Sequence, residues 1–208
     1  MRAPGVIALA LLVTGPAPAL AFVPYRTADN LHAFYWPDSC VGLTAYVGSF
    51  SEIPYDQTMG AVRAAARTWS TPAVACTYMN VEIMTGSGTP PHAGNDGRNV
   101  MLFRTDRWCR WNDPPESCSY DSSALAITSV FAKGDGHIID ADIEVNASMG
   151  DIRWMNADVM IVPGKYDLQN ALTHEMGHFL GFDHTCYKPG ANKERQLDDM
   201  GKPVPDCG

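Results

Sequence analysis

Residues 174–184 have the sequence HEMGHFLGFDH, and apolar residues recur around it at helical spacing. We therefore predict a central, mostly buried helix from about 168 to 180. His174 and His178 are four residues apart, so they lie one turn apart on the same helix face, where both imidazoles can reach one metal ion. Glu175 stands beside them, where its carboxylate can act on a metal-bound water instead of binding the metal.

A catalytic zinc site needs a third protein ligand and an open fourth position, and His184 can supply the third ligand. The helix cannot simply continue, because at ~100° per residue His184 would be rotated about 240° from His178. Gly181 lies between the two histidines and accepts a positive φ at no steric cost. We therefore predict that Gly181 ends the helix and that the chain turns there, so that His184 swings back to the metal.

The rest of the chain predicts an early helix and several strands. Apolar residues spaced three and four apart, from Met59 to Trp69, predict a helix that begins at Pro54. The turn at 133–136 (KGDG) joins two strands as a hairpin. Together these elements predict a single α+β domain. The predicted strands cover residues 39–50, 78–84, 99–104, 125–132 and 138–146.

The last predicted strand, 138–146 (IIDADIEVN), alternates strongly between apolar and polar residues. We expect its polar side to lie in solvent or in a cleft. One side carries Ile139, Ala141, Ile143 and Val145, and the other carries Asp140, Asp142, Glu144 and Asn146.

Residues 1–21 have the pattern of a cleaved secretory leader. A basic start precedes the apolar run at 6–13, and Ala19-Leu20-Ala21 is typical of a cleavage site. We predict a signal peptide at 1–21, a domain at 22–208, and secretion or location in the cell envelope. No later stretch is long or apolar enough to span a membrane. The net charge of −8 argues against a nucleic-acid partner, which would call for a basic face. We expect a monomer.

In an exported chain, an even number of cysteines predicts disulfides. The six cysteines allow 15 pairings, and pairing by sequence neighbourhood is our hypothesis. A cysteine-rich zinc cluster is the alternative, and the absence of any C-x-x-C pair argues against it. The hypothesis pairs Cys40 with Cys76, Cys109 with Cys118, and Cys186 with Cys207.

The stretch HEMGHFLGFDHT, residues 174–185, resembles the metzincin zinc endopeptidases, and Thr185 after the third histidine is similar to the matrixin branch. The resemblance implies a zincin-type catalytic domain with a twisted mixed sheet, an antiparallel edge strand, an early helix and a central active-site helix. It also implies one catalytic Zn²⁺ and an extended polypeptide substrate that pairs with the edge strand. Within this chain, the residues similar to that edge strand are Asp140, Ala141, Asp142, Ile143, Glu144, Val145 and Asn146.

The chain departs from the matrixin pattern after His184. Metzincins carry a methionine turn beneath the zinc, and Met200 is the one candidate, at a longer spacing than matrixins usually show. An exposed methionine in a polar turn is the alternative for Met200. The chain then stops at Gly208, so we expect either a very short variant or a fragment that ends before the true methionine turn. Too few residues separate the leader from the first strand to form a matrixin propeptide.

A further hypothesis is a structural Ca²⁺ or second Zn²⁺ near residues 134–137. Residues 134–137 (GDGH), together with the carboxylates of the following strand, are similar to the matrixin segment that binds a structural Zn²⁺ and Ca²⁺, but the offsets differ by about one residue. A solvated turn is the favoured alternative.

We therefore predict a secreted zinc-dependent metalloendopeptidase in which His174, His178 and His184 bind Zn²⁺ and Glu175 is the general base and acid. The alternative is an exported zinc-binding module without catalytic turnover. A third interpretation is an incidental motif in a secreted structural protein, which predicts no stoichiometric zinc.

Overall fold

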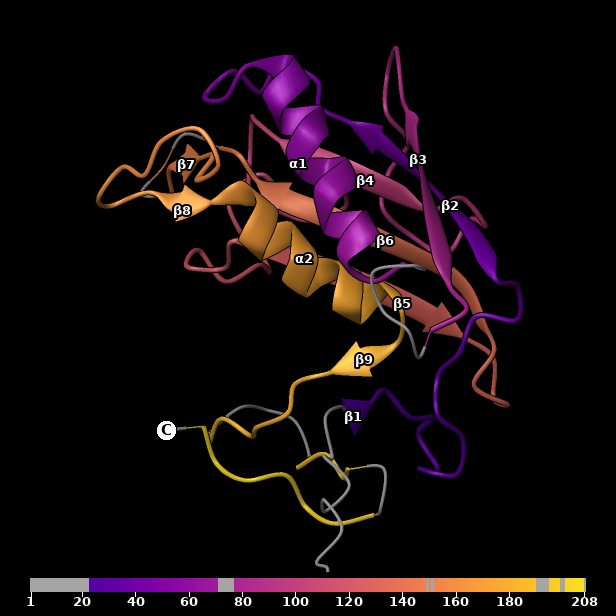
Figure 1. The fold of residues 1–208 in the computed structure, drawn as a ribbon. Coiled ribbons are helices and arrows are strands. Elements are labelled where there is room, and N and C mark those ends of the chain that lie inside the picture. Colours follow the sequence, from indigo (N-terminus) through magenta and orange to yellow (C-terminus); the bar gives the residue numbers. More distant parts are fainter. Residues whose placement is uncertain are drawn as a thin grey trace, which may run out of the picture.

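The computed structural model describes residues 23–70, 77–148, 150, 152–189, 195–198 and 201–207. The predicted signal peptide at 1–21, and also Cys76 and Met200, lie outside the described residues. The described chain forms an α+β domain, as predicted, in which a five-stranded mixed sheet carries helices α1 (Tyr55–Thr68) and α2 (Leu168–Phe179). Both helices pack on the same side of the sheet and contact each other (Figure 1).

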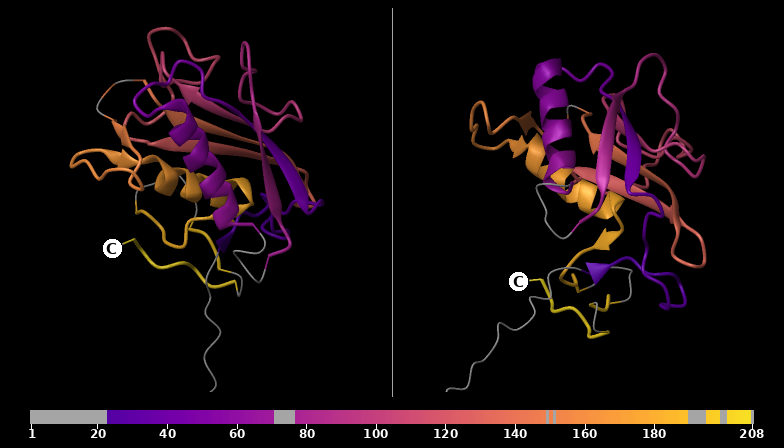
Figure 2. Two further views of the ribbon diagram at one scale, coloured as in Figure 1. Left: turned by 45° about the horizontal axis from the view of Figure 1, so that its top comes forward. Right: turned by 45° about the vertical axis from the view of Figure 1, so that its right-hand side comes forward.

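The sheet has the order β3-β2-β4-β6-β5. Four of its strands run parallel, and β5 alone runs antiparallel, to its neighbour β6. Two short pairs lie outside this sheet: β1 with β9, and β7 with β8. Two further views show the helices on one side of the sheet and β1 beside β9 below them (Figure 2). The strands are β1 (Val23–Pro24), β2 (Cys40–Tyr46), β3 (Asn80–Thr85), β4 (Val100–Arg104), β5 (Ala126–Ala132), β6 (Ile138–Asn146), β7 (Trp154–Met155), β8 (Tyr166–Asp167) and β9 (Phe182–Asp183).

Helix α2 is fixed at its start and along its inner face. The carboxylate of Asp167 accepts a hydrogen bond from the Asn170 amide at 3.0 Å, which caps the first turn. Leu172 and Met176, one turn apart, are fully buried in the core between the helix and the sheet. Because the helix buries this face, His174 on another face stays exposed.

The prediction that Asp140–Asn146 form the edge strand is wrong. These residues lie in β6, which is an interior strand between β4 and β5, and the antiparallel edge strand is β5. The polar side of β6 faces neither solvent nor a cleft, because Asp140, Asp142 and Glu144 are all 2 % exposed or less. The alternating sequence predicts a strand with one side in solvent. In the structure the carboxylates on that side are buried and accept hydrogen bonds.

For Asp140 and Asp142, the hydrogen-bond partners are backbone amides of the loop between β3 and β4 and of Val100, the first residue of β4, whereas Glu144 accepts from the hydroxyl of Tyr120. Asp140 Oδ2 accepts from the amides of residues 96 and 97, at 2.7 and 2.6 Å. Asp142 accepts from the Gly94 amide at 2.7 Å and the Val100 amide at 2.9 Å. Burial raises the pKa of Asp142 to about 7, and these two amide bonds oppose that rise. The acidic side of β6 therefore anchors a loop to the sheet.

Replacing Asp142 by alanine should lower the free energy of unfolding by about 2–4 kcal/mol, because the buried Val100 amide and the half-buried Gly94 amide lose their acceptor. The effect can be measured by urea denaturation followed by circular dichroism. Glu82→Ala, on the exposed side of β3, is the matched control and should change stability by less than about 0.5 kcal/mol. Equal stability of the two variants would contradict the anchoring role.

Two of the three predicted disulfides are present. Cys109 pairs with Cys118 inside the loop between β4 and β5, and Cys186 pairs with Cys207 after β9. Cys40 is exposed and carries no disulfide to a described residue, and its predicted partner lies outside the described part of the chain. No helix within the described ranges is both long and apolar enough to span a membrane.

Candidate metal centre

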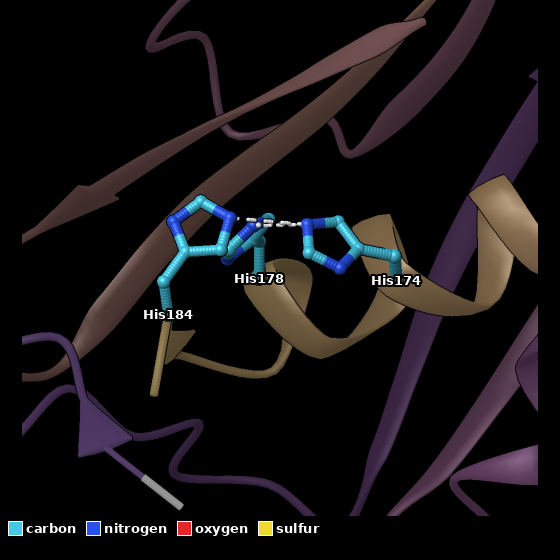
Figure 3. A group of neighbouring side chains, drawn as sticks. All are labelled: His174, His178 and His184. Carbon is cyan, nitrogen blue, oxygen red and sulfur yellow. Dashed lines mark hydrogen bonds between the residues drawn. The ribbon is translucent and has the colours of Figure 1, made fainter. Parts of the chain in front are cut away.

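Three histidine side chains converge at the end of α2. His174 and His178 project from the helix, and His184 follows β9, so that the three rings meet (Figure 3). The Nε2 atom of His174 lies 3.0 Å from Nε2 of His178 and 3.2 Å from Nε2 of His184. All three candidate ligand atoms lie within 4.8 Å of one another, so the group could hold one metal ion. Among the described residues, no second group of this kind is found.

The turn at Gly181 brings His184 back to the helix. Helix α2 ends at Phe179, and Gly181 has φ of +95°, a conformation that favours glycine. The Gly181 amide donates to the His178 carbonyl at 2.9 Å. A Cβ atom at Gly181 would also lie only 3.1 Å from the Phe34 carbonyl oxygen. Both the backbone conformation and the close approach therefore call for glycine, as predicted.

His178 is the buried member of the group, and its other ring nitrogen has defined partners. Nδ1 lies 2.7 Å from the Phe182 carbonyl oxygen and 3.2 Å from the hydroxyl of Tyr25. Burial, with a smaller contribution from Asp183, raises the pKa of Tyr25 above its ordinary value, so its hydroxyl keeps its proton. Nε2 of His178 is left to face the other two histidines.

Glu175 is buried beside the histidines and is held by the edge strand. The hydroxyl of Thr128, on β5, donates to Glu175 Oε2 at 2.6 Å. Burial raises the pKa of Glu175, while the hydrogen bond from Thr128 and the nearby His174 and His184 lower it. The carboxylate thus sits between the three histidines and β5, and the hydrogen bond from Thr128 fixes its orientation.

Hollows lie on both sides of His174. One of about 400 Å³ is lined by residues of α2, β8 and the start of β5, including Glu175 and Tyr166. A second of about 170 Å³ is lined by Trp69, Phe182 and the three histidines. The larger cavity of about 650 Å³ lies elsewhere, at the ends of β2 and β4, and no histidine of the group lines it. The three-histidine group therefore stands in an open groove.

The sequence missed three residues that support this site. Thr128 orients Glu175, and Tyr25 contacts His178. The indole of Trp69 donates to the Thr173 carbonyl at 2.7 Å, and its ring would lie 3.1 Å from a Cβ atom at Gly177. All three come from distant parts of the chain, so no local pattern around the histidines points to them.

The four residues predicted to carry the chemistry, His174, Glu175, His178 and His184, are brought together by the fold. Residues 140–146 are not at the groove's rim, since β5 stands between them and the edge. Comparisons of the chain with protein-family models and with curated proteins find no match. The geometry of the group allows it to bind a metal ion and to move a proton at the buried carboxylate beside it.

Proposed function

We propose that this chain is a zinc-dependent endopeptidase of the metzincin type, exported from the cell, in which His174, His178 and His184 hold the metal. The observation that carries the proposal is the convergence of three imidazole Nε2 atoms next to a buried, oriented carboxylate at the open edge of a sheet. The mixed sheet with one antiparallel edge strand, the early helix and the disulfides support it.

The donor set fits zinc. Nitrogen ligands of zinc bind at about 2.0–2.1 Å in tetrahedral geometry, which places two such nitrogens about 3.3 Å apart. The observed Nε2 separations of 3.0 and 3.2 Å are close to that value. Three protein ligands with an open fourth position are typical of catalytic zinc, whereas structural zinc is closed by four. When bound, zinc would lower the pKa of a coordinated water and polarise a substrate carbonyl.

Glu175 performs the proton transfers in this proposal. Its buried carboxylate takes the proton of the attacking water and later gives it to the leaving amine of the cleaved peptide bond. Burial raises the pKa of this carboxylate, a direction that favours uptake of a proton. Thr128 keeps Oε2 in place on the side of β5.

The polypeptide substrate would lie along β5. This strand is at the sheet edge and pairs only with β6 among the described strands. Its outer backbone groups therefore offer a template for an extended peptide, as in other complexes formed by strand addition. Because Thr128 of β5 touches Glu175, a peptide paired there lies beside the proton-transferring group.

Cleavage of casein tests the proposal. Purified chain loaded with zinc should produce internal fragments, and a chelator such as 1,10-phenanthroline should stop cleavage because the ligand group then holds no metal. Added zinc should restore it. A non-chelating phenanthroline isomer is the matched control. Zinc-loaded chain that cleaves neither casein nor a peptide library would favour the zinc-binding module without turnover.

A further inference from the structure

The N-terminal segment of the described chain, Val23–Trp36, lies directly against the turn that carries the third histidine. Strand β1 pairs antiparallel with β9, which places Val23 opposite Asp183 and Pro24 opposite Phe182. At the far end of the segment, the Trp36 indole donates to the Phe179 carbonyl at 2.8 Å. The segment therefore holds the chain on both sides of Gly181.

Tyr25 is the residue of this segment that reaches a metal ligand. Its amide donates to the Gly181 carbonyl at 2.7 Å, and its carbonyl accepts from the Phe34 amide at 2.8 Å, so its backbone is fixed at both ends. Its ring packs on the His178 imidazole with centroids 5.7 Å apart. Its hydroxyl lies 3.2 Å from His178 Nδ1. The side chain is thereby directed at Nδ1 of His178, the ring nitrogen that does not face the other two histidines.

The partners of Nδ1 decide which nitrogen of His178 carries the proton. The Phe182 carbonyl, at 2.7 Å, can only accept, so Nδ1 must donate to it. The Tyr25 oxygen, on the same nitrogen, then accepts as a second partner. With Nδ1 protonated, Nε2 carries the lone pair that can bind a metal ion. The oxygens of Tyr25 and Phe182 together also fix the rotation of the His178 ring.

We propose that Tyr25 is a positioning residue of the metal centre, which holds His178 through its hydroxyl and so makes the N-terminal strand part of the zinc site. The proposal rests on the zinc site of the proposed function but not on peptidase activity. Partners that orient ligating histidines typically change metal affinity by about 10- to 100-fold when they are removed. Zinc binding and docking of β1 should therefore strengthen each other.

Tyr25→Phe tests the hydroxyl while keeping the ring that packs on His178. We expect the zinc affinity, measured by competition with a chromophoric chelator, to fall by about 10-fold or more. The visible absorption of the cobalt-loaded chain should shift as well, because the ligand field of His178 changes. Tyr35→Phe is the matched control: Tyr35 lies in the same segment, is exposed and stacks on His137, so its variant should stay within about twofold of the wild type.

Each outcome decides between explanations. Tyr25→Phe with unchanged zinc affinity and cobalt spectrum overturns the proposal, even if Tyr25→Ala weakens binding, because ring packing alone would then explain the contact. Wild-type chain that binds no zinc contradicts the proposed function and this proposal together. Histidine-selective NMR of the zinc-loaded wild type needs no variant: a protonated, exchange-protected Nδ1 at His178 supports the assignment, and an unprotonated Nδ1 overturns it.

Discussion

Glu175→Gln should lower kcat/KM for peptide hydrolysis by about 10²- to 10⁴-fold while the chain keeps its zinc. Glutamine has nearly the size of glutamate, and its carbonyl oxygen can still accept the hydrogen bond from Thr128. It cannot take a proton from water, however, so the proton transfers fail while the site remains assembled. The measurement is the hydrolysis rate of a quenched fluorescent peptide, together with zinc content by elemental analysis.

Glu82→Gln on the exposed side of β3 makes the same change in charge away from the groove and is the control for the loss of a carboxylate. It should leave kcat/KM within about twofold of the wild type. If Glu175→Gln cleaved peptides as fast as the wild type with equal zinc content, Glu175 would not be the proton-transferring group.

His178→Ala should weaken zinc binding by about 10²- to 10³-fold. Apparent zinc affinities of about 10–16 kcal/mol in four-ligand sites correspond to roughly 2.5–4 kcal/mol for each ligand, and about 1.4 kcal/mol is one factor of ten. His178 is the buried member of the candidate ligand group, so water cannot easily take its place. The dissociation constant, measured by competition with a chelator, reports the change directly.

His92→Ala is the control for removal of a histidine, because His92 is exposed and stacks on Trp111 away from the group. Zinc affinity should stay within about twofold in this variant. Equal zinc affinities of His178→Ala and the wild type would show that zinc binds elsewhere. The assignment of the three histidines as the metal centre would then be wrong.

The elements of the fold could be predicted from the sequence where the pattern is local. Helix α2 follows from its apolar spacing and its Asp167 cap, and Gly181 marks its end through the positive φ that the turn requires. The hairpin of β5 and β6 follows from its turn at 133–136, where the Gly136 amide donates to the Lys133 carbonyl. Each of these depends on residues close together in the chain.

The order of strands could not be predicted in the same way. The alternation in β6 has the period of a half-exposed strand, and periodicity alone does not distinguish an acidic side in water from one that accepts backbone amides. In the structure β6 is interior because β4 and β5 pair with its two sides, and the loop before Val100 covers Asp140 and Asp142. The burial of these carboxylates depends on a loop 44 to 48 residues earlier in the chain.

The same distinction, between local sequence patterns and contacts across the chain, applies to the candidate site. Its three histidines and Glu175 fall within a few turns of chain, and their spacing predicts a shared metal ion. Thr128 and Tyr25 reach the site across 47 and 153 residues, so only the folded chain brings them there. The candidate metal ligands and Glu175 were therefore predictable, and the residues that orient them were not.

The most direct test of the central claim is mass spectrometry of casein incubated with the zinc-loaded chain, in parallel with Glu175→Gln at equal zinc content. The account predicts new fragments from cleavage at internal peptide bonds with the wild type, and intact casein with the variant. Intact casein with the zinc-loaded wild type, or the same fragments at the same rate with the variant, would contradict it.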